Sequence, residues 1–165
     1  MRSGAAAWLL LASAACQPKA LEPQEKLLYY PDGAVLRRYT TLGDKIEGGM
    51  TDYYPDGQVK FERFFQNGAQ AGRQIVYYPG GKVKEVQYFV DGLKQGGDTL
   101  WYENGQPQFA VSFRDGKMDG YMRKWTPEGE LFFEARYVMD SLAEVRRSQA
   151  LLDSLGFDLQ DRNGE

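Results

Sequence analysis

Apolar and polar residues alternate over short stretches of this chain, and tight turns separate the stretches. Between positions 59 and 65, Val59, Phe61 and Phe65 share one face while Lys60 and Glu62 share the other. An alternation of period two is typical of a β-strand with one face buried. The pattern therefore predicts short strands that follow one another closely.

Two kinds of turn bound each predicted strand. In the segment 55–57, Pro-Asp-Gly, proline presets one backbone dihedral, the acid can bond its own backbone, and glycine accepts a positive φ. At the other end, Asn67-Gly68 is a strong signal for a two-residue hairpin. A second strand is predicted from about Gly72 to Tyr78, so each unit holds two antiparallel strands.

The unit recurs every 24 residues from Tyr29 onward, and no gap is needed to align the copies. The opening aromatic residue recurs as Tyr29, Tyr53, Tyr77, Trp101 and Trp125, and the turn glycine as Gly33, Gly57, Gly81, Gly105 and Gly129. Self-similarity at one fixed spacing indicates a repeat architecture. We predict an all-β fold, an extended antiparallel β-hairpin meander over residues 29–140, roughly 45 Å long at about 4.8 Å per strand.

The pattern changes after the fifth copy, which is expected to lack its second half. Residues 141–144, Ser-Leu-Ala-Glu, match a helix capping box, and Leu142, Val145, Leu152 and Leu155 recur at near-helical spacing before Gly156. We therefore expect a short C-terminal α-helix over residues 141–156 that caps the last hairpin. Residues 157–165 form a tail.

The chain begins with an export signal over residues 1–15, because Arg2 precedes a short apolar run and small residues follow. The run ends in Ser-Ala-Ala-Cys, and Cys16 is the only cysteine. This end resembles the lipobox of bacterial lipoproteins, with Ser13 where that pattern has Leu, Val or Ile. The resemblance implies that the Cys16 thiol receives a diacylglycerol, that cleavage occurs before Cys16, and that its amino group is then acylated. These palmitate-type chains would anchor the protein in a membrane. The alternative is a secreted protein with an incidental thiol.

Residues 16–28 are expected to form the acylated cysteine and a polar tether, which contains Pro18 and Pro23. By resemblance to sorting signals, Gln17 after the cysteine favours the outer membrane. The sequence therefore predicts a location in the bacterial cell envelope, on a periplasmic or surface face.

The composition limits which partners, reactions and metal sites are expected for this chain. Twenty basic and 23 acidic residues give a net charge of −3 without a block of one sign, which disfavours nucleic acid as a partner. The chain has no histidine, which removes the commonest general base and metal ligand. We expect no enzyme activity, no cofactor and no metal site. Acidic turn residues could form a cation rim, but turn chemistry accounts for Asp32, Asp56, Asn104 and Glu128.

Together these motifs resemble the MORN repeat variant, a family found in bacterial proteins often labelled antitoxin components. Its pattern is carried here by residues 77–81, Tyr-Tyr-Pro-Gly-Gly, by Asp91-Gly92 and by Gly96. The first copy departs from it, with Gly43-Asp44 in the reverse order. The resemblance covers Tyr29 to about Asp140 and implies an extended β-sheet.

Two aromatic ladders are the candidate binding residues. The first ladder is Tyr29, Tyr53, Tyr77, Trp101 and Trp125, and the second ladder is Tyr30, Tyr54, Tyr78 and Tyr102. Strand alternation places them on opposite faces. The rings could stack on glycans or lipid headgroups, or they could simply pack along the sheet and stabilise it.

Three functions remain open from the sequence. The first is a membrane-anchored envelope lipoprotein whose repeats bind or scaffold another envelope protein or polymer. The second is an antitoxin-like partner that neutralises a toxin, which would act in the cytoplasm, whereas residues 1–15 direct the chain out of it. The third is an envelope enzyme subunit, which the absence of a catalytic constellation disfavours.

Overall fold

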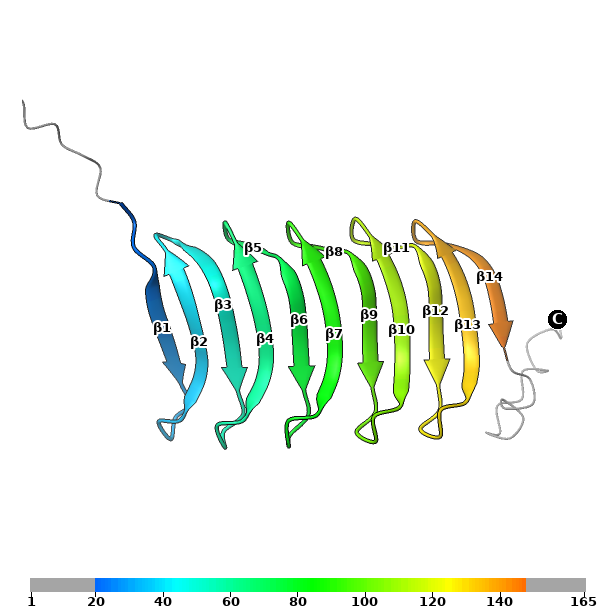
Figure 1. The fold of residues 1–165 in the computed structure, drawn as a ribbon, viewed down its shortest axis with the longest axis horizontal. Coiled ribbons are helices and arrows are strands. Elements are labelled where there is room, and N and C mark those ends of the chain that lie inside the picture. The colour runs from blue at the N-terminus through cyan, green and yellow to red at the C-terminus, as the bar shows by residue number, and fades with distance from the viewer. Residues whose placement is uncertain (1–19, 148–165) are drawn as a thin grey trace, which may run out of the picture.

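The computed structural model describes residues 20–147, which form one open antiparallel β-sheet (Figure 1). Its strands are β1 (Gln24–Tyr29), β2 (Val35–Leu42), β3 (Lys45–Tyr53), β4 (Val59–Gln66), β5 (Ala69–Gln70), β6 (Gly72–Tyr77), β7 (Val83–Val90), β8 (Leu93–Lys94), β9 (Gly96–Trp101), β10 (Pro107–Arg114), β11 (Lys117–Met118), β12 (Gly120–Trp125), β13 (Leu131–Val138) and β14 (Ser141–Arg147). Eleven strands lie side by side in chain order, and the two-residue strands β5, β8 and β11 lie beside β4, β7 and β10. The predicted hairpin meander is confirmed.

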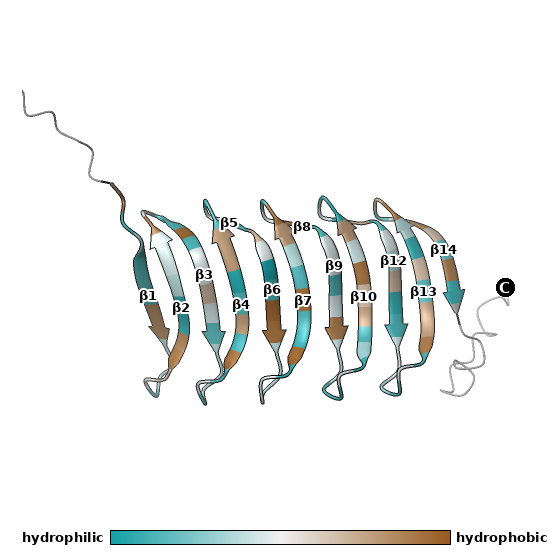
Figure 2. Cartoon of the chain, viewed as in Figure 1, coloured by the Kyte–Doolittle hydropathy of each residue, from teal (hydrophilic) through white to brown (hydrophobic). Residues whose placement is uncertain are grey.

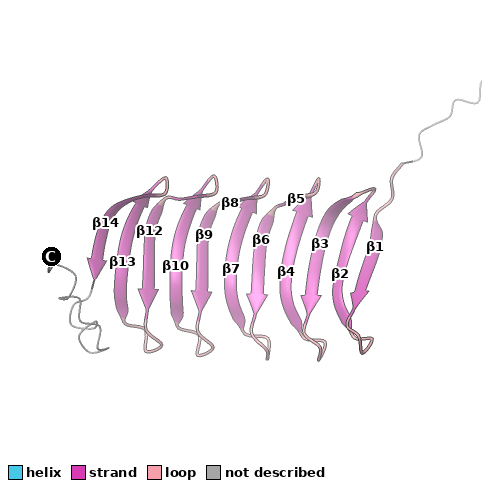
Figure 3. Cartoon of the chain, turned by 180° about the vertical axis from the view of Figure 1, so that it is seen from behind, coloured by secondary structure: helices cyan, strands magenta, loops and turns pink. Residues whose placement is uncertain are grey.

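The sheet is a single row of hairpins. Within residues 20–147, the front and rear views show no second layer over either face (Figures 1 and 3). Eleven strands at about 4.8 Å spacing span about 50 Å. Because each hairpin touches mainly its two neighbours, stability depends on contacts between successive repeats.

One end of each hairpin is a three-residue loop with a bulge. In the second copy, Gly57 N donates to Tyr54 O at 2.9 Å and Tyr54 N donates to Gln58 O at 2.8 Å. Gly57 takes a φ of 84°, and Asp56 Oδ1 accepts a bond from Gln58 N at 3.0 Å. This combination is a type I turn followed by a left-handed residue, and it explains why proline, acid and glycine recur there.

The other end is a two-residue turn. Asn67 and Gly68 have φ values of 54° and 84°, as a type I′ turn requires. Gly68 N donates to Ile46 O at 3.1 Å, which ties this turn to the preceding repeat. In the two-residue turn of the first copy, Gly43 has a positive φ of 64° and Asp44 does not, so the Gly43-Asp44 order matches a type II′ turn. Both sequences therefore satisfy the same hairpin.

The prediction of a C-terminal helix over residues 141–156 is wrong for the part that the structure describes. Ser141–Arg147 is strand β14, paired antiparallel with β13, and no helix occurs in residues 20–147. Met139 and Asp140 form the hairpin turn with φ values of 48° and 69°. They occupy the position of Asp115-Gly116 one repeat later, so the fifth copy has its second half. The remainder of the predicted helix lies outside the described residues.

Pairing with β13 explains the outcome. Without β14, the backbone N–H and C=O groups on the outer side of β13 would have no ladder partner, and a strand supplies one for each. A capping-box pattern is a local preference, and these nonlocal bonds override it.

At the N-terminal end, β1 begins at Gln24, so the last residues of the segment predicted as a tether already lie in the sheet. Residues 20–147 contain no helix that is long and apolar enough to cross a membrane.

Candidate binding surface

The two faces of the sheet differ in burial. One face, here called the buried face, carries Met50, Gln74, Asp98, Val111 and Ala135, each 9% exposed or less. Because no second layer covers residues 20–147, neighbouring side chains on the same sheet must cover these residues. Ile75, which is 7% exposed, is covered in the same way on the opposite face. Cross-strand pairs such as Gln74 with Gln87 and Asp98 with Val111 hold these residues on the same side.

The middle of the buried face is polar. Gln70 Nε2 donates to Gln74 Oε1 at 2.6 Å, and Gln74 Nε2 donates to Gln87 Oε1 at 2.7 Å. Gln87 Nε2 in turn donates to Asp98 Oδ2 at 2.9 Å, and Lys94 Nζ donates to the same oxygen at 2.7 Å. This polar row joins residues of five strands, β5 to β9. A connected row of this kind satisfies buried amides that would otherwise each cost free energy.

Glu85 adds a second carboxyl group to the polar row. Its Oε1 accepts a bond from Gln87 Nε2 at 2.7 Å. Burial and the neighbouring Asp98 carboxylate raise the pKa of Glu85. Asp98 Oδ1 is buried and accepts no hydrogen bond from the groups that the structure describes. A proton held on the Glu85 carboxyl group would supply the missing donor.

A charged cluster precedes the polar row on the same face. Arg37 Nη2 and Arg63 Nη2 donate to Asp52 Oδ2 at 2.8 and 3.0 Å. The hydrogen bond to Asp52 raises the pKa of Arg37, whereas burial lowers the pKa of Arg63. Two guanidinium groups share one carboxylate, so the cluster carries a net positive charge.

The first ladder lies on the opposite face, here called the ladder face. Tyr77 Oη donates to Glu62 Oε2 at 2.6 Å on the preceding hairpin. Burial and this bond raise the pKa of Tyr77 to about 12. Tyr29 is exposed at the edge of the sheet, and Tyr53, Tyr77, Trp101 and Trp125 are half-buried. Each ring therefore keeps part of its surface accessible to solvent.

An open pocket of about 430 Å³ lies beside one ladder residue. It is lined by Lys82, Val83, Trp101, Tyr102 and Gly105, which come from the start of β7, the end of β9 and the turn that follows β9. Val83 is 41% exposed. At the corresponding place in the last repeat, Gln106 Oε1 lies 3.0 Å from where a Cβ on Gly129 would stand, so that side chain occupies the space. The pocket at Trp101 offers an apolar wall with one cationic side chain.

The second ladder makes bonds between repeats. The phenol groups of Tyr30, Tyr54, Tyr78 and Tyr102 donate to the carbonyl oxygens of Tyr53, Tyr77, Trp101 and Trp125, at 2.8 to 2.9 Å. Burial and the Glu103 carboxylate raise the pKa of Tyr78. Lys60 Nζ and Lys84 Nζ lie 5.5 and 5.3 Å from the ring centres of Tyr54 and Tyr78. The hydroxyl groups are thus engaged within the sheet.

Two segments of the array match a known protein family. The family described as MORN repeat variant matches residues 46–67 and 70–91, each of which runs from one strand through its turn to the next. The chain carries MORN repeats. A comparison with curated proteins gives no match.

Two solved structures show distant likenesses to this MORN array. A structure of accessory secretory proteins 1, 2 and 3 in Streptococcus pneumoniae matches 61% of this chain and 18% of that chain, with 17% identity and a TM-score of 0.36. A GtfA/B complex bound to UDP and GlcNAc matches 91% of this chain and 30% of that chain, with 13% identity and a TM-score of 0.30. This chain thus spans less than a third of either, and likenesses at these TM-scores do not bear on function.

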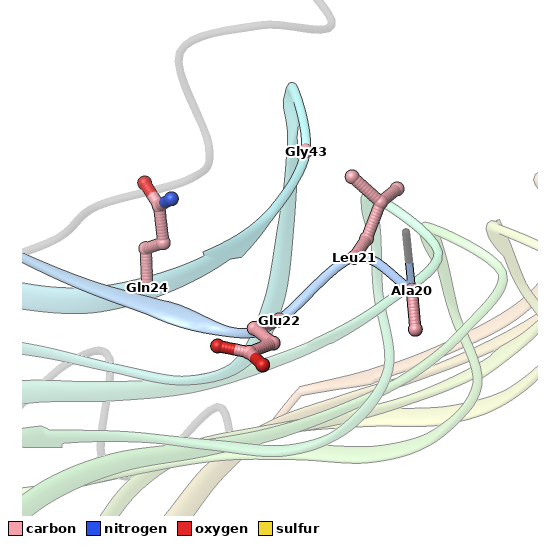
Figure 4. Close-up of a pocket in the computed structure, with 5 residues that line it drawn as sticks. All are labelled: Ala20, Leu21, Glu22, Gln24 and Gly43. Atoms are coloured by element: carbon pink, nitrogen blue, oxygen red, sulfur yellow. The ribbon is translucent and has the colours of Figure 1, made fainter. Parts of the chain in front are cut away.

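A second pocket lies at the N-terminal edge of the MORN array. Ala20, Leu21, Glu22, Gln24 and Gly43 line a hollow of about 290 Å³ (Figure 4). Leu21 reaches to 3.4 Å from where a Cβ on Gly43 would stand. The pocket is formed by the segment that enters β1 and holds no pair of charged groups of opposite sign.

The polar row and the charged cluster were not predicted from the sequence. Gln74, Gln87 and Asp98 stand at polar positions of strands, and polar positions on an uncovered sheet usually face solvent. Figure 2 shows that β6 is hydrophilic at its start and hydrophobic toward its end. This change along the strand is the available sequence signal for the polar row. Because cross-strand partners decide burial here, register had to be known first.

Acidic turn residues serve the backbone. Oδ1 of Asp32, Asp56 and Asn104 each accepts a bond from the main-chain N–H two residues later, at 3.0 Å. In the described part of the chain, no three Asp, Glu, Cys or His side chains lie close enough together to hold a metal ion. The candidate lipidation site, Cys16, lies outside the described residues.

Proposed function

We propose that this MORN repeat protein is a lipid-anchored component of the bacterial cell envelope, favouring the outer membrane, and that its sheet binds another envelope protein or polymer. MORN repeats form a repeat-based binding or scaffold module. The anchor rests on Cys16, the only cysteine, directly after the apolar run of the export signal.

The anchor would hold the array close to a membrane. Residues 17–23 separate Cys16 from β1, and seven extended residues reach about 25 Å. The sheet then extends about 50 Å from its N-terminal edge. This arrangement would present the ladder face and its pocket to partners near the membrane surface.

The single observation that carries the binding role is the pocket at Trp101. Trp101 and Val83 give it an apolar wall, and Lys82 stands at its border. Exposed rings extend this surface, because Phe64 and Tyr88 stand one repeat apart on the ladder face and are each 46% exposed. Tryptophan and tyrosine are the residues that most often dominate binding energy at protein interfaces.

Metabolic labelling with a fatty-acid probe tests the anchor. We expect label on the wild-type chain and none on Cys16→Ala, because the diacylglycerol that carries acyl chains attaches to that thiol. Gln17→Ala is the matched control, since it changes the neighbouring residue and keeps the thiol. A wild-type chain without label, or label retained on Cys16→Ala, would refute the anchor.

Crosslinking in intact cells followed by purification tests the binding role. We expect an envelope protein or polymer to be captured by the wild-type chain and to be reduced about tenfold or more with Trp101→Ala, because truncating a buried aromatic contact commonly costs 2 kcal/mol or more. Lys117→Ala, at an exposed position of the short strand β11 at the opposite hairpin end, is the control and should capture as well as wild type.

Two results would replace this proposal. Capture of a cytoplasmic toxin whose activity the chain abolishes would favour the antitoxin-like role. Hydrolytic turnover by the purified chain on an envelope substrate would favour an enzyme subunit, a role that the proposal excludes.

A further inference from the structure

Both edges of the sheet are open within the described residues, and they are strands of the same kind. Eleven strands lie side by side with every neighbouring pair antiparallel, so the first, β1, and the last, β14, run in the same direction. An open edge presents a row of unpaired backbone groups that can pair with another strand. The direction of the edge strand, its two faces and its charges limit which strand can pair with it.

Symmetry limits how two copies can continue one sheet. If one copy followed another head to tail in the same orientation, β14 would meet a parallel β1, unlike every pairing in the sheet. If the second copy were turned over to make that pairing antiparallel, its ladder face would continue the buried face of the first. Only a twofold axis perpendicular to the sheet keeps both the antiparallel direction and the two faces, and it pairs an edge with itself.

We propose that two copies of this chain associate through β14, with Val145 of each copy opposite Val145 of the other. This inference does not depend on the lipid anchor or on the Trp101 pocket. It rests on the open edge at β14, on the direction of its strands and on the charges along it.

The charges select this register. In a twofold antiparallel pair centred on Val145, Glu144 of one copy stands opposite Arg146 of the other, and the same contact occurs twice. Centring the pair on Glu144 or on Arg146 would instead place like charges face to face, which is destabilising. Glu144 and Arg146 are both exposed. Within one copy Arg146 Nε donates to Glu144 Oε1 at 2.7 Å and Arg146 Nη1 lies 3.9 Å from Glu134 Oε1, so these side chains would exchange or share those partners on pairing.

The other edge lacks such complementarity. Centring a self-pair of β1 on Glu25 or Lys26 would oppose like charges, and centring it on Leu27 or Leu28 would bring no acid opposite a base. Centring it on Gln24 would bring Lys26 opposite Glu22, which lies outside the strand. In β14, Val145 also lies beside buried Ala135 on the buried face, so the pairing would extend the apolar line of that face. Backbone bonds supply the attraction and the charges set the register.

Disulfide trapping tests the geometry. In the full chain carrying Cys16→Ala, so that only one thiol remains, Val145→Cys should form a disulfide-linked dimer under mild oxidation. Directly opposed residues in antiparallel strands have Cα atoms about 4.5 to 5.5 Å apart, within disulfide range. The matched control is Val138→Cys, at 47% against 40% exposure, which lies on the inner strand β13 and should not be trapped. Equal trapping at both positions, or none at 145, would overturn the proposal.

Charge exchange tests the register separately. Glu144→Arg alone and Arg146→Glu alone should each weaken self-association by about tenfold or more, measured by sedimentation velocity, because each puts like charges opposite one another. Mixing the two variants should restore association to near the wild-type level, since every opposed pair is then of opposite sign. Such rescue cannot come from misfolded variants. A wild-type chain that stays monomeric, or a mixture that fails to associate, would refute the β14 pairing.

Discussion

The phenol group of Tyr54 donates a 2.8 Å hydrogen bond to the backbone carbonyl oxygen of Tyr77, one repeat further along the chain. The same bond joins Tyr30 to Tyr53 at 2.8 Å. Tyr54 lies in the turn between β3 and β4, and Tyr77 is the last residue of β6. The bond therefore joins two successive repeats at the end of the strands, beyond the backbone hydrogen bonds of the sheet, and fixes the spacing between these repeats. The paired aromatic residues at the start of each repeat therefore have different tasks.

The first prediction concerns this bond. Tyr54→Phe keeps the ring and removes the donor, so we expect the free energy of unfolding to fall by about 1 kcal/mol. Denaturant-induced unfolding measures it. Tyr88→Phe is the control, because Tyr88 is 46% exposed on the ladder face, and it should change stability little. Equal effects at the two positions would show that the Tyr54 bond adds no stability.

The second prediction concerns Glu85, whose pKa is raised by burial and by Asp98. The folded protein holds that proton more tightly than the unfolded chain, so the stability associated with it is present at low pH and is lost as pH rises through the raised pKa. Glu85→Gln removes the ionisation and keeps an acceptor for Gln87 and a donor for Asp98. We expect the variant to be more stable than wild type at neutral pH, and this advantage to shrink as the pH falls through the raised pKa of Glu85 toward the ordinary value of 4.5.

Thermal unfolding from about pH 3.5 to pH 7.5 measures that difference. Glu128→Gln removes one carboxyl group from an exposed turn and serves as the control. An advantage of Glu85→Gln that grows on acidification would contradict the assigned direction of the pKa shift.

The repeat fold could be predicted because its signals are local. Asn67-Gly68 dictates a reversal through its own backbone preferences, and alternation from Val59 to Phe65 needs no knowledge of the neighbouring strand. The turn at Met139-Asp140 has no glycine, so the last hairpin gave no such signal. The Ser141 to Glu144 pattern then favoured a helix that pairing with β13 excludes.

The binding surface could be predicted only in part. The first ladder was identifiable from its 24-residue spacing, and the structure adds the pocket beside Trp101. The bonds of the second ladder and the polar row depend on which residues face one another across strands. Gln74 and Gln87 are 13 residues apart, and no local pattern brings their amides within 2.7 Å.

The third prediction concerns Met139, which has a φ of 48° in the last turn. A left-handed conformation is costly for most side chains and is tolerated by asparagine. Met139→Asn should therefore stabilise the protein by about 0.5 to 1 kcal/mol. Val138→Asn, at the adjacent exposed strand position, should give no such gain in denaturant unfolding. If Met139→Asn destabilised the chain, the turn would not have the assigned backbone.

The last prediction uses two neighbouring glycines in β3. Gly48 has a φ of 81°, whereas Gly49 has no positive φ, and an added Cβ at either position meets nothing within 4 Å. Any difference between the two alanine variants must therefore come from the backbone. Gly48→Ala should lower the free energy of unfolding by about 1 to 2 kcal/mol, because an L side chain is disfavoured in the left-handed region. Gly49→Ala should be neutral or slightly stabilising, because alanine restricts the unfolded chain more than glycine does. Denaturant unfolding of the two variants in parallel measures the difference, and equal stabilities would mean that the left-handed backbone at Gly48 does not form in solution.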